Sequence, residues 1–179
     1  CHVTAGDIAL YGKGGRVCGD EFFIPDLQMD KKGAGFFREG DSQYYIEQVV
    51  RGGRVYIFGG GHVAQKLVPV LAGVQFRCVV LEDREEFCRP ELFPGAEETR
   101  LIDLSRLEEE LKVTEQDDIC IMTRGHKDDM TVQAFAMRTC ARYIGVIGSR
   151  KKTAAITERL LQQGFAQEEF DRITTPIGL

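Results

Sequence analysis

The sequence lacks three features, and each absence argues against a class of protein. No stretch of its 179 residues approaches the roughly 18 consecutive apolar residues of a membrane-spanning helix, and no signal-peptide pattern opens the chain. It contains no Cys-x-x-Cys or Cys-x-x-His pair, which argues against a structural zinc site. Excess positive charge is absent too. The net charge of −5 argues against nucleic acid or an anionic membrane as the main partner.

The cysteines that are present follow no regular spacing, so they do not indicate a disulfide framework. Cys78 and Cys120 fall inside apolar stretches that are typical of buried strands. We therefore expect reduced thiols and a cytoplasmic protein. His62, His126 and Asp128 could together hold a metal ion, but nothing in their spacing demands one, and we assign no metal site.

The rest of the chain is organised around the stretch from Arg54 to Ala64. Residues 56–58 are Tyr-Ile-Phe, an unbroken apolar run typical of a parallel strand that is buried on both faces. Three glycines follow at positions 59–61, and apolar residues then recur with helical spacing at positions 63, 67, 70 and 71. The pattern predicts a strand, a tight turn and the start of a helix.

Gly59, Gly61 and Ala64 match the G-x-G-x-x-G/A arrangement of dinucleotide-binding turns. There the first glycine makes the turn, the second lets a phosphate approach the backbone, and the third position keeps helix and strand close. The helix that begins near His62 would offer free N–H groups and partial positive charge to an anion. We therefore expect Gly59, Gly60, Gly61 and His62 to contact a phosphorylated ligand.

The next predicted strand, Phe76–Leu81, strengthens this interpretation. It is followed by Glu82 and Asp83, about where a dinucleotide-binding fold carries its ribose-binding carboxylate. We predict Asp83 for that role. The alternative is a Rossmann-like turn that binds nothing, because a fold does not fix a function.

The remaining sequence alternates between strand and helix patterns. Further strands are expected at residues 98–102, 119–122 and 143–147. Strands that alternate with helices predict an α/β fold, a Rossmann-like doubly wound parallel sheet. We assign it residues 53–179 and expect its C-terminal end to be incomplete. Residues 1–52, with many glycines, predict a partial N-terminal domain or appendage of short strands.

Three of the expected helices have recognisable ends. One is expected to be capped by Asp103 or Ser105. Its leucines Leu104, Leu107 and Leu111 should lie on one face. Another is expected over Met130–Ala141. The last is expected to stop at Gly164, a residue suited to the left-handed position that ends many helices.

Ligands of such sheets bind beyond the carboxyl ends of the strands, where the strand order reverses. That rule selects the loops Gly59–His62, Thr123–Asp128 and Gly148–Lys152, which we expect to converge on one crevice. In the third loop, Ser149, Arg150 and Lys151 put a hydroxyl and two cations at a helix start, which suits a phosphate. The alternative is that Ser149 is a plain N-cap beside solvated basic residues.

The second loop is rich in polar side chains. Arg124, Gly125, His126 and Asp128 form a set suited to hydrogen bonding with a polar heterocycle or to acid–base chemistry. The two loop histidines do not by themselves indicate catalysis, and the catalytic residues stay unknown at this point.

Five blocks of the sequence together resemble a known family. The blocks are residues 55–64 (VYIFGGGHVA), 83–87 (DREEF), 122–126 (MTRGH), 143–152 (YIGVIGSRKK) and 176–179 (PIGL). In these blocks and their order, the chain resembles the C-terminal Rossmann domain of the xanthine dehydrogenase accessory factor family, the XdhC/CoxI type. Members of that family continue past the last block, so we expect further residues at the C-terminus, and we expect truncation at the N-terminus as well.

The resemblance implies a maturation factor for molybdenum hydroxylases. Such a factor would bind molybdenum cofactor (molybdopterin), support its sulfuration by a cysteine desulfurase and deliver it to a xanthine dehydrogenase-type enzyme. It would be a cofactor-insertion chaperone more than a catalyst. On this interpretation the glycine turn and Ser149, Arg150 and Lys151 hold the phosphate, while Arg124 and His126 orient the polar ring.

The alternative function is an NAD(P)-dependent oxidoreductase, with Asp83 on the ribose and His126 as the acid–base group. A second copy of the chain often completes such a crevice, so a homodimer is a plausible assembly.

Overall fold

The computed structural model describes residues 6–12, 15–20, 34–47 and 52–177 and divides the chain into two compact units, Cys1–Val50 and Arg51–Leu179. In the first unit, β1 (Ala9–Gly12) pairs antiparallel with β2 (Gly15–Gly19), and β3 (Ala34–Glu39) pairs antiparallel with β4 (Ser42–Glu47). The expected short strands are therefore present. An apolar run at 21–24 that could have formed another strand lies outside the described residues.

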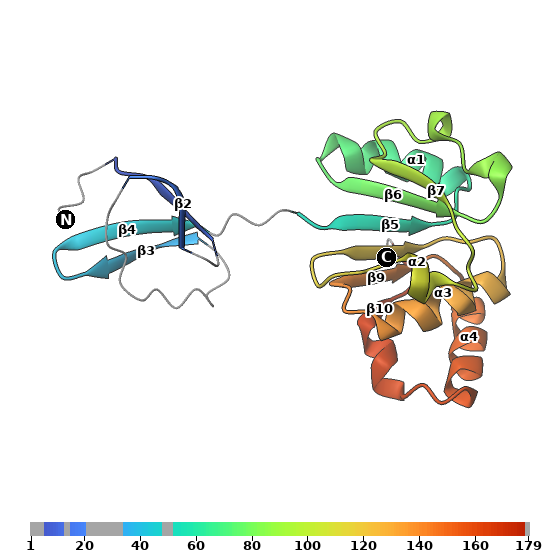
Figure 1. Cartoon of the computed structure of the whole chain (residues 1–179). Helices are drawn as coiled ribbons and strands as arrows, with labels where there is room; N and C mark the ends of the chain where they lie inside the picture. The colour runs from blue at the N-terminus through green and yellow to red at the C-terminus, as the bar shows by residue number, and fades with distance from the viewer. Residues whose placement is uncertain (1–5, 13–14, 21–33, 48–51, 178–179) are drawn as a thin grey trace. The chain divides into compact units, whose positions relative to one another are not determined.

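The second unit is built on a six-stranded parallel sheet with the strand order β10-β9-β8-β5-β6-β7 (Figure 1). Its strands are β5 (Arg54–Phe58), β6 (Arg77–Glu82), β7 (Glu98–Leu101), β8 (Asp118–Ile121), β9 (Tyr143–Val146) and β10 (Ile173–Thr174). Its helices are α1 (His62–Gly73), α2 (Leu107–Glu110), α3 (His126–Arg138) and α4 (Arg150–Gln162), with short 3-10 turns at Glu85–Phe87, Pro90–Leu92 and Gln167–Arg172. The predicted Rossmann-like parallel sheet is confirmed.

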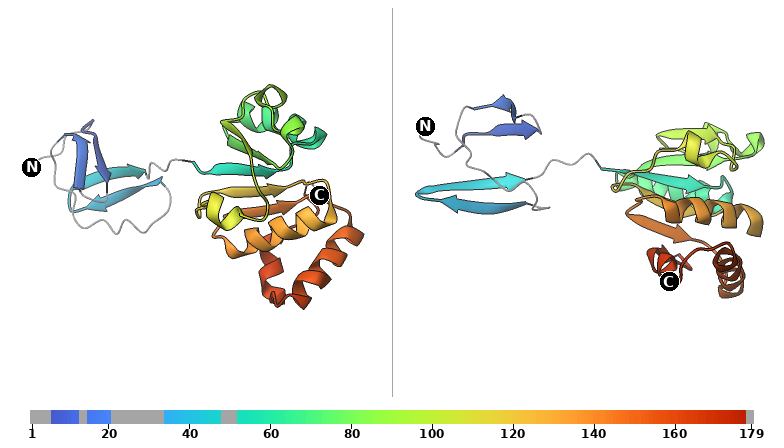
Figure 2. Two further views of the ribbon diagram at one scale, coloured as in Figure 1. Left: turned by 45° about the vertical axis from the view of Figure 1, so that its right-hand side comes forward. Right: turned by 60° about the horizontal axis from the view of Figure 1, so that its bottom comes forward.

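Helices α1 and α3 cover opposite faces of this sheet, as Figures 1 and 2 show from three directions. Side chains of β5 alternate between the two faces, because successive residues of a strand point to opposite sides. Tyr56 and Phe58 belong to the cluster on the α3 side, and Val55 and Ile57 belong to the cluster on the α1 side. The central strand is thus buried on both faces, which explains its unbroken apolar sequence.

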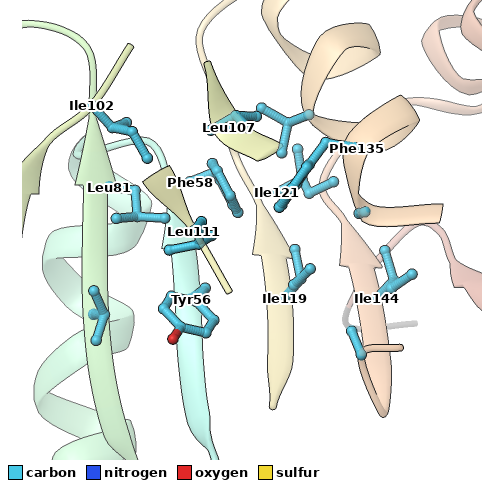
Figure 3. Close-up of a cluster of buried hydrophobic side chains, with 14 of the residues drawn as sticks. Tyr56, Phe58, Leu81, Ile102, Leu107, Leu111, Ile119, Ile121, Phe135 and Ile144 are labelled. Carbon is cyan, nitrogen blue, oxygen red and sulfur yellow. The ribbon is translucent and has the colours of Figure 1, made fainter. Parts of the chain in front are cut away.

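The cluster on the α3 side is the larger of the two (Figure 3). It contains Phe135 of α3, whose ring meets that of Phe58 edge to face with centroids 6.3 Å apart. Leu107 of α2 and residues of four strands complete it. Full burial of such side chains contributes about 2 kcal/mol each, so this cluster fixes α3 and its first turn against the sheet.

Three elements differ from the sequence prediction. The helix expected from Asp103 or Ser105 is a single turn with Arg106 at its N-cap, because the Asp103 carboxylate instead accepts hydrogen bonds from Ser105 and closes a local turn. Helix α3 begins at His126, four residues earlier than expected. Strand β10 was not predicted, since a two-residue strand leaves no periodic signal.

Other features follow the sequence closely. Gly164 adopts a positive φ of 95° just after α4, and the Phe165 N–H donates to the Leu160 carbonyl, as in a glycine-terminated helix. Within the described part of the chain, no helix is long and apolar enough to cross a membrane.

Candidate functional site

The candidate site lies at the carboxyl ends of the strands, where the chain reverses direction across the sheet. From β5 the chain proceeds to β6 and β7 on one side, and then crosses back to β8, β9 and β10 on the other. The switch point is therefore between β5 and β8, whose residues pair directly. The turns after β5, β8 and β9 all leave the sheet at this edge, as parallel strands require.

The three glycines after β5 have three different environments. Gly59 adopts a φ of 107°, and a Cβ there would lie 2.5 Å from the Met122 carbonyl oxygen, so only glycine makes this turn. A Cβ on Gly60 would lie 2.7 Å from the Phe87 carbonyl oxygen. Gly61, at the N-cap of α1, faces open space, because a Cβ there would have no neighbouring atom within 4 Å. A ligand can therefore approach the backbone at Gly61 and not at Gly60.

No side chain in the first turn of α1 neutralises the partial positive charge at its N-terminus. Its N-cap makes no side-chain hydrogen bond, and its first turn carries no acidic residue. Ala64 is buried against the sheet and keeps α1 close to β5, as the third position of the motif should. His62, the first residue of α1, is exposed at this edge. The helix N-terminus is therefore available to an anion.

The acid that ends β6 is Glu82, one residue before the predicted Asp83. Its carboxylate is 2% exposed and accepts hydrogen bonds from the Gly60 N–H at 2.6 Å and from the Arg84 guanidinium at 2.8 and 2.9 Å. Burial alone would raise the pKa of Glu82, but the hydrogen bonds from Arg84 and Gly60 outweigh it and lower the pKa to about 2. Glu82 therefore holds the glycine turn, and its oxygens are already occupied.

Asp83 lies beyond the end of the strand and is half exposed. Its pKa is raised, mainly because it adjoins the Glu82 carboxylate and is partly buried. Its carboxylate is one wall of a small pocket whose lining residues are Gly59, Leu81, Glu82, Asp83, Arg84, Leu104, Thr123 and Arg124. The pocket brings together the glycine turn, the acid and the second loop, so the geometry is compatible with the predicted ribose role. That role stays a prediction.

The segment after β8 presents Arg124 and Lys127 to solvent and buries Asp129. Arg124 is exposed and makes no ion pair with any residue that the structure describes. Gly125 is the N-cap of α3 and makes no side-chain cap. Asp129, in the first turn of α3, is fully buried and accepts a hydrogen bond from the Thr123 hydroxyl. His126 begins α3, but its side chain lies outside the described residues.

The loop after β9 divides its basic residues between two roles. Ser149 is the N-cap of α4, and its hydroxyl accepts from the Lys152 N–H at 3.3 Å. Arg150 and Lys151 are exposed and, like Arg124, have no ion-pair partner among the described residues. The Lys152 ammonium instead pairs with the buried Asp129. The cap that we gave as the alternative for Ser149 is therefore present, and it leaves the two neighbouring cations free.

A further contact continues this edge toward the end of the chain. The Thr153 hydroxyl of α4 lies 3.1 Å from that of Thr175, which follows β10. Ile177 then packs beside Gly145 and donates its N–H to the Val146 carbonyl at 3.0 Å. The segment after β10 therefore belongs to the same edge as the three predicted loops.

Sequence reasoning missed Glu82, Thr123 and Asp129. It also placed Lys152 at the end of the third loop without giving it a role. No local sequence pattern distinguishes any of the three missed residues from its neighbours, as the adjacent Asp128 and Asp129 in the first turn of α3 illustrate. Within the described residues, no three histidine, cysteine or acidic side chains form a group that could hold a metal ion. The arrangement as a whole is suited to binding an anion.

The parallel sheet and the glycine turn define a Rossmann domain. Residues 55–179 match the family model described as the XdhC Rossmann domain, and the chain belongs to that family.

The proteins to which the chain is similar include two curated proteins and a solved structure. A protein of Bacillus subtilis (strain 168), named as a probable xanthine dehydrogenase subunit, is 25% identical over 135 residues, which cover 75% of this chain and 39% of that protein. The uncharacterized protein YqeB of Escherichia coli (strain K12) is 24% identical over 127 residues, 70% of this chain and 23% of that protein. A crystal structure described as a xanthine dehydrogenase from Bacillus halodurans superposes with a TM-score of 0.63 at 28% identity, over 76% of this chain and 38% of the other. The chain thus spans about two fifths or less of the relatives it matches.

Proposed function

We propose that this domain binds molybdenum cofactor, or a related phosphorylated ligand, as part of an accessory factor for a xanthine dehydrogenase-type molybdenum hydroxylase. The proposal is supported by membership of the XdhC Rossmann family and by relatives whose names refer to xanthine dehydrogenase. The factor would hold the cofactor for sulfuration and insertion. The domain then acts as a binding and delivery protein, and its residues carry out no covalent step.

The observation that carries the proposal is a set of free cations beside an open helix N-terminus. Arg124, Arg150 and Lys151 have no ion-pair partner among the described residues, whereas Arg84 and Lys152 of the same edge are paired within the protein. Gly61 leaves room for a group to reach the backbone N–H groups of α1. Unpaired cations and free N–H groups are the two features of phosphate sites.

The residues at this edge fit a cofactor that has a phosphate and a polar ring, because different residues would bind each part. Gly61, His62, Arg150 and Lys151 would hold the phosphate by backbone and charge-assisted hydrogen bonds. Arg124, one wall of the small pocket, would orient the polar ring. When bound, the cofactor would bring the molybdenum chemistry of the client enzyme, and this chain would supply binding and orientation only.

The proposed partners follow from this role. The client is a xanthine dehydrogenase-type molybdoenzyme, and a cysteine desulfurase is the proposed source of sulfur. A cytoplasmic location suits both, and a homodimer would bring a second copy to the crevice.

A second candidate is an NAD(P)-dependent oxidoreductase, which is favoured by the position of Asp83 beside the glycine turn. The Glu82 carboxylate argues against it, because its hydrogen bonds to Gly60 and Arg84 leave it without free oxygens for a ribose. Asp83 would have to bind the ribose alone. The two candidates therefore predict different ligands for the same edge.

The test is calorimetric titration of the purified chain with molybdenum cofactor and, separately, with NAD and NADP. We expect molybdenum cofactor to bind and the dinucleotides to bind at least tenfold more weakly. Arg150→Ala should weaken cofactor binding by about tenfold, which corresponds to about 1.4 kcal/mol. Arg159→Ala is the matched control, because Arg159 is an exposed arginine in the last turn of the same helix.

Tight dinucleotide binding without cofactor binding would establish the oxidoreductase alternative. Equal effects of the two arginine variants would show that the start of α4 is not the phosphate site.

A further inference from the structure

The run of three basic residues at the start of α4 contains one that faces the protein. Arg150 and Lys151 are exposed, whereas the Lys152 side chain is 20% exposed and its ammonium pairs with the Asp129 carboxylate. Asp129 belongs to the first turn of α3 and is 0% exposed. The sequence does not distinguish these three residues, but the structure gives the third a different partner.

Asp129 joins two loops of the carboxyl edge. One of its oxygens accepts from the hydroxyl of Thr123, which lies in the loop after β8. Its other oxygen pairs with Lys152, in the first turn after the β9 loop. The first turns of α3 and α4 are thus linked through one buried carboxylate. The two helices are neighbours in the domain (Figure 1).

Stability alone is a weak explanation for such a pair. Removing two charges from water is costly, and apolar residues of similar volume often replace a buried ion pair without loss of stability. A pair that links two loops can instead fix their relative positions. The alignment of charged groups around a ligand depends on such supporting contacts.

We infer that the Asp129–Lys152 pair is the positioning device of the anion site, an inference that rests on the proposed function. The pair holds the first turns of α3 and α4 so that Arg124, Arg150 and Lys151 are aimed at one ligand. Lys152 is then a positioning residue and makes no contact with the anion.

The test uses the full chain, with inorganic pyrophosphate as the probe and calorimetry at two salt concentrations. Asp129→Asn and Lys152→Met should each weaken binding by about tenfold. The double variant should bind no more weakly than the weaker single variant, because both changes remove one shared contact. The dependence of affinity on salt should stay as in the unaltered chain, since no ligand-contacting charge is lost.

A matched ion pair serves as the control. Asp118 of β8 pairs at 2.6 Å with Arg142, which precedes β9, at the amino ends of the two strands that lead into α3 and α4. Asp118→Asn should leave pyrophosphate affinity unchanged. If it weakens binding as much as Asp129→Asn does, general loosening of the two strands explains the result, and the inference is wrong.

Two other outcomes would also overturn it. If Lys152→Met weakens both binding and its salt dependence while Asp129→Asn strengthens binding, Lys152 contacts the anion directly. If all folded variants bind like the unaltered chain, the pair contributes to folding only. Should Lys152→Met fail to fold, the neutral double variant replaces it in this comparison.

Amide hydrogen exchange of the free chain gives a readout that needs no ligand. Asp129→Asn should speed exchange at residues 124–128 and 149–152 and leave residues 59–62 unchanged. If the unaltered chain does not bind pyrophosphate or molybdenum cofactor, the proposed function fails, and the exchange pattern alone decides whether the pair fixes the loops. Uniform or absent changes in exchange would then refute the positioning role.

Discussion

Ion pairing of charged residues differs between the amino and carboxyl edges of the parallel sheet. At the amino ends of the strands, Arg54 and Arg77 share the Glu97 carboxylate, and Arg142 pairs with Asp118. At the carboxyl ends, Glu82 and Arg84 are paired, and so are Asp129 and Lys152, but Arg124, Arg150 and Lys151 have no partner among the described residues. The paired groups hold the architecture, and the unpaired ones are free to meet a ligand.

In such a domain, unpaired charged residues indicate a ligand site better than paired ones do. Charged groups that a protein satisfies internally have little affinity left for anything else, whereas unpaired cations beside open N–H groups attract anions. Topology makes the carboxyl edge the expected ligand site, and the unpaired Arg124, Arg150 and Lys151 lie at that edge.

The largest expected effect is at Glu82. Glu82→Gln keeps the shape of the side chain but removes the nearer counter-charge of the largely buried Arg84 guanidinium, which keeps only the Asp83 carboxylate at 3.8 Å. We expect a loss of about 3 kcal/mol in the free energy of unfolding, measured by urea denaturation. Glu109→Gln, in the exposed pair with Arg106, should cost less than about 1 kcal/mol. Equal losses would show that the two pairs do not differ in this way.

The pH dependence of stability should report the same carboxylate. Because the pKa of Glu82 is lowered to about 2 in the folded chain, its contribution is present above the unfolded pKa of about 4.3 and is lost as the pH falls toward 2. Between pH 5 and pH 2 the unaltered chain should lose about 3 kcal/mol more stability than Glu82→Gln. Asp83, whose pKa is raised, contributes with the opposite sign. Parallel pH profiles for the two proteins would contradict the assignment.

The glycines of the turn should separate stability from binding. Gly60→Ala forces a Cβ against the Phe87 carbonyl and should destabilise the domain by about 2 kcal/mol. The Cβ added by Gly61→Ala has no neighbouring atom within 4 Å, so the loss of stability should be less than about 1 kcal/mol. The same methyl group should block access to the backbone and weaken the binding of phosphorylated ligands by about tenfold. Thermal unfolding and calorimetry measure the two effects, and the reverse pattern would place the ligand elsewhere.

The smallest effect is expected at the amino edge. Glu97→Gln removes the shared partner of Arg54 and Arg77, all three of which are partly exposed to solvent. The loss of stability should stay below about 1 kcal/mol, and affinity for anions should not change. An increase in anion binding at this edge would weaken the contrast, because it would show that any freed cation attracts the ligand.

Much of the fold was predictable because it depends on local sequence signals. The apolar run at residues 56–58, the glycine turn and the end of α4 at Gly164 each depend on neighbouring residues, and all three are present in the structure. The helix expected at Asp103 shrank to one turn because its polar side chains bond to the local backbone. The short β10 gave no signal, because its pairing with β9 supplies its structure.

The candidate site was predictable only in its position. Sequence and topology placed three loops at one edge, and the structure brings Gly59 beside Met122 and joins Asp129 to Lys152 across two of these loops. Sequence spacing could not show which acid would be buried, since Glu82 and Asp83 are adjacent and both acidic. Burial and partner choice depend on atoms that are distant along the chain.

The sequence by itself determined the type of fold, the turn that a phosphate can approach and the edge where charged residues gather, because periodicity and glycine chemistry are local. The tertiary structure decided which of those charges are paired within the protein. Glu82 pairs with Arg84 and Lys152 pairs with Asp129. The three exposed cations at the same edge, Arg124, Arg150 and Lys151, have no partner among the described residues. The reason is physical: a charge is buried only where folding brings a counter-charge within reach, and that proximity is a property of three-dimensional packing.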